Sequence, residues 1–258
     1  MSFPIVPGKH RLDAIVTASA MLEHRRSSGR LGPITTPSAA VLCLQRGLPE
    51  RVRRRVRIHR IGRLMGDLYA VRGTNGRVVV LTGFGLGAPI VAAQAEELIA
   101  LGARRLVSVA LAGGIQPTLE PGSTVLVDAA LRDEGTSHHY LAPGTAVCAD
   151  LELTDRLATG LDRHGVRYER GTTWSTDAPY RETREEAVRH AAEGVLVVDM
   201  EMAALFAVAR VRGVAAAGVL VAGDSLAGGV WTPPARLDEM EHALERAYAI
   251  AIEVLDAP

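Results

Sequence analysis

The chain has 258 residues, 48% of them hydrophobic, and its 29 basic and 29 acidic residues give a formal net charge of zero. A neutral chain with 4% aromatic residues lacks the basic surface and the stacking side chains of nucleic-acid binders, so no nucleic-acid partner is expected. The two cysteines, Cys43 and Cys148, form no C-x-x-C pair, which disfavours a disulfide framework and a zinc site and fits a reducing cytoplasm. Because no apolar run of about 18 residues and no signal-peptide pattern is present, we expect a cytoplasmic protein without a membrane span.

The first part of the chain predicts an irregular N-terminal segment followed by strands and one helix. Prolines interrupt residues 1–37, which read as irregular to weakly helical. Short β-branched runs between turn residues then predict strands, and an apolar run bounded by proline and glycine predicts a helix. The expected strands are residues 39–44, 67–72 and 77–82, the last two forming a hairpin, and the expected helix is residues 90–101.

The remainder alternates strands and helices, as α/β proteins do. The expected strands are residues 105–110, 122–130, 172–176, 195–198 and 216–222, and the expected helices are 150–164, 200–211 and 236–255. At this length, such a pattern fits one large α/β domain or two small ones. Adjacent His138 and His139 would face opposite sides of a strand, so a shared metal ion is not expected.

Three acids stand where strands end in the second half of the chain. Asp199 and Glu201 lie at the junction of a strand and a helix, and Asp224 ends the following strand. Ligands of α/β sheets bind beyond the carboxyl ends of strands, which makes these acids candidate site residues. Acids at such places also cap helices and turns, and this interpretation stays open, more so for Asp224 than for Glu201.

Glycine-rich turns at three strand ends indicate an anion site. Gly47 follows the first strand, residues 82–89 read T-G-F-G-L-G-A-P, and residues 111–117 read L-A-G-G-I-Q-P. Bare backbone N–H groups in such turns bind anions, and the nearby Arg51 would add a guanidinium. Residues 51–57 contain five arginines, so Arg51 also fits a solvated basic run. The second turn lacks the G-x-G-x-x-G spacing of a dinucleotide site.

Five motifs, in the right order, resemble those of the nucleoside phosphorylase superfamily of uridine and purine phosphorylases. D-M-E-M-A-A-L-F at 199–206 is similar to the family's E-M-E-A-A-A-L-F, and R-D-E-G-T-S-H-H-Y at 132–140 is typical of it. Residues 47–51 resemble G-D-P-x-R, residues 82–89 resemble T-G-I-G-G-P-S, and residues 108–116 resemble R-V-G-T-C-G-G-L-Q. The resemblance covers roughly residues 39–229. It implies a single α/β domain over 1–258, with a mixed twisted sheet closing toward a barrel and flanked by helices.

The resemblance also implies the site and its partners. Glu201 would bind the ribose 2′-hydroxyl, with Met200 packed on the sugar, and Asp224 would protonate the leaving base. His10 would reach the ribose 5′-hydroxyl of a neighbouring subunit in a homo-oligomer of dimer units, often a hexamer; as a lone histidine in an irregular segment it also fits a solvated side chain. The further substrate-binding residues implied are Gly113, Thr176 and Arg181, and the phosphate-binding ones are Gly47, Arg51, Gly83 and the position of Ser108. Arg46, Arg60 and Arg63 are further candidates for phosphate binding.

Three departures from the family's motifs concern the phosphate and the base. Ser108 stands where the family has a phosphate-binding Arg, and Leu111 stands where it has a Thr. Losing one charged hydrogen bond of this kind costs about 1.5–3 kcal/mol, or roughly ten- to a hundredfold in affinity. The base-stacking Phe falls on Pro179, and the uracil-reading Gln-x-Arg pair has no clear counterpart, with Trp174 and Tyr180 as alternative aromatic faces.

The sequence therefore predicts a uridine phosphorylase-like nucleoside phosphorylase. It would cleave the N-glycosidic bond of a nucleoside with inorganic phosphate, giving free base and pentose 1-phosphate without any other cofactor. Two alternatives stay open because of Ser108 and Leu111. The first is a nucleosidase that uses water in place of phosphate. The second is a nucleoside-binding protein whose phosphate site is lost. The sequence leaves the base and the pentose undetermined.

Overall fold

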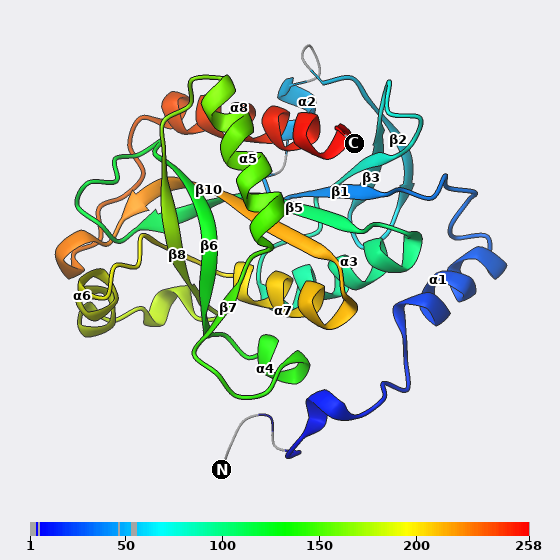
Figure 1. Ribbon diagram of the computed structural model, residues 1–258, viewed down its shortest axis with the longest axis horizontal. Helices are drawn as coiled ribbons and strands as arrows, with labels where there is room; N and C mark the ends of the chain where they lie inside the picture. The colour runs from blue at the N-terminus through cyan, green and yellow to red at the C-terminus, as the bar shows by residue number, and fades with distance from the viewer. Residues whose placement is uncertain (1–3, 5, 46, 53–55, 258) are drawn as a thin grey trace.

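The computed structural model describes residues 4, 6–45, 47–52 and 56–257, and its centre is a mixed β-sheet (Figure 1). The strands are β1 Ala39–Cys43, β2 Ile58–Arg63, β3 Asp67–Val71, β4 Val78–Thr82, β5 Arg105–Gly114, β6 Thr124–Asp133, β7 Ala146–Cys148, β8 Tyr168–Thr176, β9 Val197–Asp199 and β10 Ala215–Ser225. Their order is β10-β6-β8-β9-β5-β1-β4-β3-β2, with β7 paired to β6. Because β10 also pairs with β5, five strands close into a barrel and the others extend from it. The expected mixed sheet that closes toward a barrel is confirmed.

The register brings three strand ends together. β1, β4, β5 and β10 run parallel, and Ser225 at the end of β10 lies beside Gly114 at the end of β5. β9 runs antiparallel to β5, with Val198 opposite Gly113. The end of β9 at Asp199 therefore lies near the carboxyl ends of β5 and β10, where α/β folds bind ligands.

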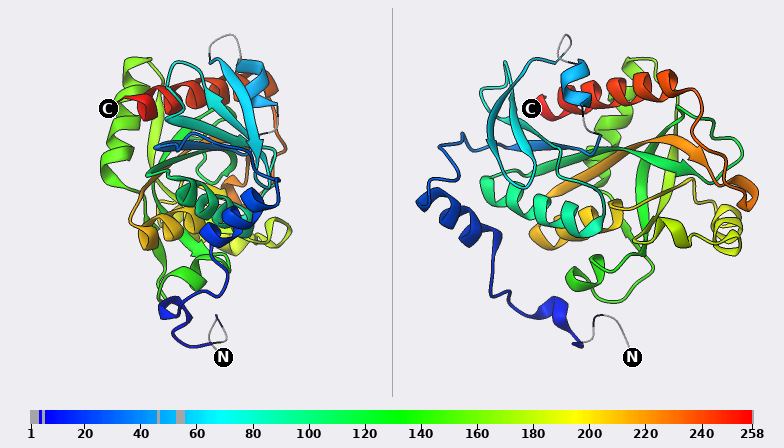
Figure 2. Two further views of the ribbon diagram at one scale, coloured as in Figure 1. Left: turned by 90° about the vertical axis from the view of Figure 1, so that its right-hand side faces the viewer. Right: turned by 180° about the vertical axis from the view of Figure 1, so that it is seen from behind.

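Helices cover both faces of the sheet (Figures 1 and 2). They are α1 Ala18–Ser27, α2 Leu48–Arg51, α3 Ala88–Leu101, α4 Ser137–Tyr140, α5 Leu151–Arg163, α6 Arg184–Ala192, α7 Met202–Arg212 and α8 Leu237–Asp256, with short 3₁₀ turns η1 Lys9–Arg11, η3 Pro179–Arg181 and η4 Ala227–Gly229. α3 and α7 pack on one face, and α5 and α8 pack on the other. A side chain at Gly160 of α5 would come within 2.9 Å of Ile250 and Val254, so glycine there lets α5 approach α8 closely. Within the described residues, no helix is long and apolar enough to cross a bilayer.

Three local expectations were wrong. His138 and His139 lie in the short helix α4, not in a strand. β5 continues to Gly114, because its last residues pair with both β10 and β9. Residues expected to be irregular or weakly helical contain α1, whose first turn is capped by Thr17 Oγ1 accepting from the Ala20 N–H at 3.2 Å.

Candidate active site

Asp199 is a buried carboxylate that holds the start of α7 in place. One of its oxygens, Oδ1, accepts hydrogen bonds from Thr173 Oγ1 at 2.9 Å and from Ser175 Oγ at 2.7 Å. The other, Oδ2, accepts from the backbone N–H groups of Glu201 at 2.8 Å and Met202 at 2.7 Å. These two N–H groups lie at the helix start and have no partner within α7, so Asp199 serves as its cap.

Glu201 is 3% exposed and bridges two segments that are distant in sequence. Its Oε1 accepts from the Gly87 N–H at 2.7 Å, and its Oε2 accepts from the Met200 N–H at 3.1 Å. Gly87 belongs to the glycine-rich turn before α3 and has a φ of 102°, a conformation that L side chains rarely adopt. The turn therefore presents the N–H of Gly87 to a buried acid of this chain.

The two acids compete for one proton. Burial, followed by the charge of Asp199, raises the pKa of Glu201 to about 7. Burial also raises the pKa of Asp199, but its four accepted hydrogen bonds oppose this shift. Because Glu201 accepts only two hydrogen bonds, it is the member of the pair that takes up a proton near neutral pH.

A pocket of about 680 Å³ opens where β5, β9 and β10 end. Met200, Glu201, Gly113 and Asp224, four residues expected at the site, all line it. The other lining residues are Leu44, Gln45, Leu86, Ala110, Leu111, Ala112, Pro179, Tyr180, Glu182, Val198, Asp199, Gly223, Leu226, Trp231, Pro234 and Met240. Its volume is that of a small-molecule site, and no lysine or arginine is among these described lining residues.

The carboxylate of Asp224 lies close to Gly113 at the wall of the pocket. Its Oδ2 accepts from Trp231 Nε1 at 2.7 Å. A side chain at Gly113 would come within 2.8 Å of Leu226, 2.9 Å of Val198 and 3.2 Å of Asp224 Oδ1. The glycine is therefore needed for this carboxylate to lie against β5.

Glu182 is a pocket residue that sequence reasoning missed. It is half-buried directly after η3, and burial, then the charges of Asp224 and Glu186, raise its pKa to about 7. The family resemblance placed the base near Trp174, Pro179 and Tyr180, but nothing in the sequence distinguishes the nearby Glu182 from a solvated acid. Its proximity to Asp224 becomes evident only in the fold.

Other expected residues are not among these lining residues. Arg51 pairs with Glu241 of α8 at 2.6 Å, and Gly47 precedes it in an exposed turn. Ser108 is fully buried on β5, and its hydroxyl has no hydrogen-bond partner among the described residues. Thr176 ends β8, Gly83 follows β4, and Arg181 is exposed in η3. Arg60 pairs with Asp67 at 2.8 Å, Arg63 is exposed at the end of β2, and Arg46 lies outside the described residues.

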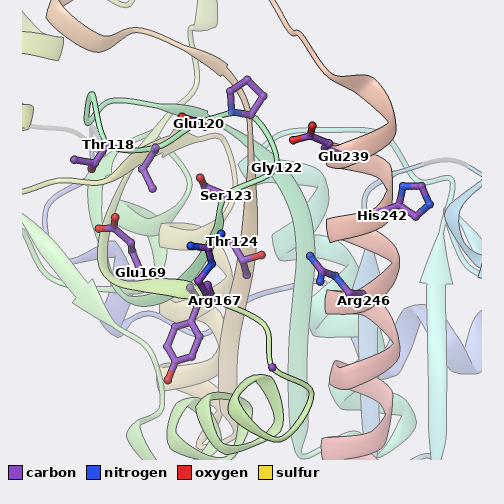
Figure 3. A pocket seen from close by; sticks show the side chains of 14 residues that line it. Thr118, Glu120, Gly122, Ser123, Thr124, Arg167, Glu169, Glu239, His242 and Arg246 are labelled. Carbon is purple, nitrogen blue, oxygen red and sulfur yellow. The ribbon is translucent and has the colours of Figure 1, made fainter.

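His10 occupies a different part of the molecule. The N-terminal elements lie along the outside of the molecule (Figure 2), with α1 beside α3 and η1 beside α4. His10 lines a separate cleft of about 1030 Å³ with residues of α1, α3, α4 and α7. A third hollow, of about 900 Å³, lies between the β5–β6 loop and α8. Arg167 and Arg246 extend into it together with acids such as Glu169 and Glu239 (Figure 3), so its lining is mixed in charge. In the described part of the chain, no group of three or more His, Cys, Asp or Glu side chains is arranged to hold a metal ion.

The fold and the acid-lined pocket define an α/β barrel protein with a small-molecule site at the strand ends. Residues 41–256 match the phosphorylase superfamily, so the chain belongs to that family, and the resemblance predicted from its motifs is confirmed. The uridine phosphorylase of Treponema pallidum is 30% identical over 183 residues, which are 66% of this chain and 69% of that protein.

Other relatives agree with this membership. The uridine phosphorylase of Thermococcus kodakarensis is 41% identical over 105 residues, 41% of this chain but only 38% of the relative's length. The guanosine phosphorylase of Halorubrum lacusprofundi is 26% identical over 187 residues, 71% of this chain and 78% of that protein. A crystal structure of uridine phosphorylase from Vibrio fischeri has the same fold, with a TM-score of 0.73 at 23% identity over 86% of this chain and 92% of the other.

Proposed function

We propose that this protein cleaves the N-glycosidic bond of a nucleoside, with inorganic phosphate as the attacking group. The observation that carries the proposal is the convergence of Glu201, Met200 and Asp224 on one pocket at the strand ends. Membership of the phosphorylase superfamily, and relatives named as uridine and guanosine phosphorylases, support phosphate as the second substrate.

Each of the three residues has a chemical role in this proposal. Glu201, when ionised, accepts a hydrogen bond from a ribose hydroxyl, and Met200 packs on the sugar. As the glycosidic bond lengthens, the sugar develops oxocarbenium character and the base becomes negatively charged. Asp224 donates a proton to the departing base, a task for which the half-buried acid is positioned on the pocket wall. The attacking group then bonds to C1′.

Hydrolysis is the second candidate function, and the lining of the pocket favours it. A phosphate dianion needs cations or several N–H donors, yet no lysine or arginine is among the described lining residues. Leu111 lines the pocket, Ser108 is buried in β5, and the Arg51 guanidinium is paired with Glu241. With water as nucleophile, the same three residues would release base and free pentose.

One experiment separates these functions. A panel of purine and pyrimidine nucleosides is incubated with the protein with and without inorganic phosphate, and free base, pentose and pentose 1-phosphate are measured. Phosphorolysis requires base release that depends on phosphate and yields pentose 1-phosphate. Base release without phosphate replaces this proposal by hydrolysis, whereas binding without any base release leaves a nucleoside-binding protein.

Glu201→Gln tests the sugar contact in the same assay. Losing one charged hydrogen bond to the sugar lowers kcat/KM about ten- to a hundredfold. Glu185→Gln is the matched control, because Glu185 is exposed in the first turn of α6 and does not line the pocket. Equal kcat/KM values for the two variants would remove Glu201 from the mechanism.

A further inference from the structure

One end of the active-site pocket brings together two carboxyl groups from separate elements. Glu182 follows η3, and Asp224 lies near the end of β10. Both side chains line the pocket and both are half-buried. After burial, the charge of Asp224 is the next largest cause of the raised pKa of Glu182, so the two groups are close enough to interact.

Among the described residues, no lysine, arginine or histidine forms an ion pair with either carboxyl group of this pair. Asp224 accepts one hydrogen bond, from Trp231 Nε1, and no hydrogen bond or ion pair to Glu182 is found within the described part of the chain. The charges that shift the pKa of Glu182 are those of Asp224 and Glu186, and both disfavour its ionised form. The pocket that these two acids line also has apolar lining residues, among them Pro179, Leu226, Trp231, Pro234 and Met240. This end of the pocket therefore offers carboxylate acceptors and apolar walls.

Such a surface discriminates between bases by the polarity of their edges. Uracil presents a single N–H between two carbonyl oxygens, and those oxygens would face the carboxylates as acceptor against acceptor. Guanine presents N1–H and the 2-amino group side by side, a pair of donors that one carboxylate accepts in bidentate fashion. A site built around hydrogen-bonding groups rejects a substrate that leaves them unpaired.

We propose that Glu182 is a specificity-determining residue that selects nucleosides of 2-amino-6-oxopurine type, such as guanosine, over uridine. The inference rests on the proposed function, because it takes this pocket to be the nucleoside site. Glu182 accepts the two N–H groups of the base edge, so its ionised form gains hydrogen bonds that the described residues of the pocket do not give it. The acceptor for the base edge is Glu182, and Asp224 serves the leaving base in its protonated form.

Equilibrium binding tests the proposal without requiring turnover. Dissociation constants of guanosine, inosine and uridine are measured by calorimetry, without phosphate, for the wild type, Glu182→Gln and Glu185→Gln. If the protein hydrolyses a nucleoside during the calorimetric titration, ratios of kcat/KM replace ratios of dissociation constants. The wild type is expected to bind guanosine at least tenfold more tightly than uridine, with inosine, which lacks the 2-amino group, in between.

The variants locate this preference. Glu182→Gln replaces a carboxylate by an amide that donates as well as accepts, so the preference, taken as the affinity for guanosine divided by the affinity for uridine, falls about ten- to a hundredfold. Inosine changes less than guanosine, and Glu185→Gln leaves all ratios as in the wild type. A wild-type ratio near one, a preference for uridine, or an unchanged ratio in Glu182→Gln overturns the proposal.

The outcome is distinguishable from failure of the proposed function. Base release from nucleosides together with an unchanged ratio in Glu182→Gln removes the role of Glu182 and leaves glycosidic cleavage standing. Preferential binding of guanosine that depends on Glu182, without any base release, retains the inference and removes catalysis. Binding of neither nucleoside to the wild type overturns both.

Discussion

At the scale of single residues, we expect ionisation of Glu201 to make kcat/KM depend on pH. Its pKa of about 7 means that the carboxyl is protonated below neutrality and ionised above it. Because the ionised form accepts the sugar hydroxyl, kcat/KM for the preferred nucleoside should rise with pH through about 7 and then level off. The apparent value belongs to the Asp199–Glu201 pair. Because Glu182 also titrates at about 7, the test is made in the Glu182→Gln background. Initial rates over a pH series should show the acid limb in Glu182→Gln and lose it in the double variant Glu182→Gln/Glu201→Gln, and persistence of the limb in the double variant would contradict the assignment.

Glu182 links the pocket to stability. Its pKa is raised from 4.5 to about 7 in the folded chain, so the native state holds a proton that the unfolded state releases between these pH values. The protonated carboxyl of Glu182 therefore contributes to stability in full below about pH 4.5, and this contribution is lost as the pH rises through about 7. Glu182→Gln does not ionise and escapes this loss.

The expected result is a melting temperature above that of the wild type at pH 8, with the difference shrinking toward zero at pH 5. Calorimetric scans at both pH values measure it, with Glu185→Gln as the exposed control, which should show no such pH-dependent gain. A Glu182→Gln variant less stable than the wild type at pH 8 would show that the carboxylate has a stabilising partner.

The sequence identified individual pocket residues where a motif determined both their type and their position. It did not identify Glu182, whose place in the pocket depends on the tertiary fold. Glu201 and Met200 belong to the motif at the start of α7, and Gly113 belongs to a glycine turn. Glu182 is recognised as a pocket residue because its charge interacts with that of Asp224, which is distant in sequence. Local sequence patterns contain no information on an interaction between such distant segments.

At the scale of the element, β5 and β8 offer a matched pair of buried serines. The Ser108 hydroxyl on β5 has no partner among the described residues, whereas Ser175 Oγ on β8 donates to Asp199 at 2.7 Å and accepts from the Ala203 N–H at 3.0 Å. A buried polar group without a partner costs about 1–3 kcal/mol, and a hydrogen bond to a charged group contributes about 1.5–3 kcal/mol.

Alanine at the two positions should therefore have opposite effects. Ser108→Ala should leave the free energy of unfolding unchanged or raise it by about 1 kcal/mol, and Ser175→Ala should lower it by about 2 kcal/mol. Urea denaturation of both variants measures the difference. Substantial destabilisation by Ser108→Ala would indicate that its hydroxyl has a partner, such as a buried water.

Strand β5 shows which part of a strand can be predicted from the sequence and which part cannot. Apolar, β-branched runs placed β1, β4 and the start of β5 correctly, because a buried parallel strand needs such side chains. The last residues of β5 include glycines, which are poor strand formers, and pair with β9 and β10. The extension of β5 is thus a consequence of tertiary pairing rather than local propensity.

At the scale of the whole molecule, the alternation of strands and helices predicted the α/β class, and the family's motifs predicted the barrel. Closure depends on β6 pairing antiparallel with β10 and on β10 pairing with β5, contacts between segments far apart in the chain. Neither composition nor periodicity specifies such pairings. The resemblance to a family predicted a sheet that closes toward a barrel, but it did not specify these pairings either.

His10 in the N-terminal segment lies outside the active-site pocket of its own chain, which bears on whether two chains share a site. His10 lies in η1, lines a cleft with α3, α4 and α7, and is not among the described residues of the active-site pocket of its own chain. If it binds the ribose, as the family resemblance implies, it does so in a neighbouring copy. We therefore expect the protein to form dimers in which each chain completes the other's site.

Complementation between inactive variants tests this arrangement. His10→Ala and Glu201→Gln should each lower activity in homogeneous preparations, because every site lacks one of the two groups. Mixing equal amounts under conditions that exchange subunits produces half mixed dimers, each with one intact site, so activity should recover to about one quarter of the wild type. Size-exclusion chromatography confirms the dimer, and base release measures the recovery. If the mixture shows only the mean activity of the two variants, His10 acts within its own chain or has no role at the site.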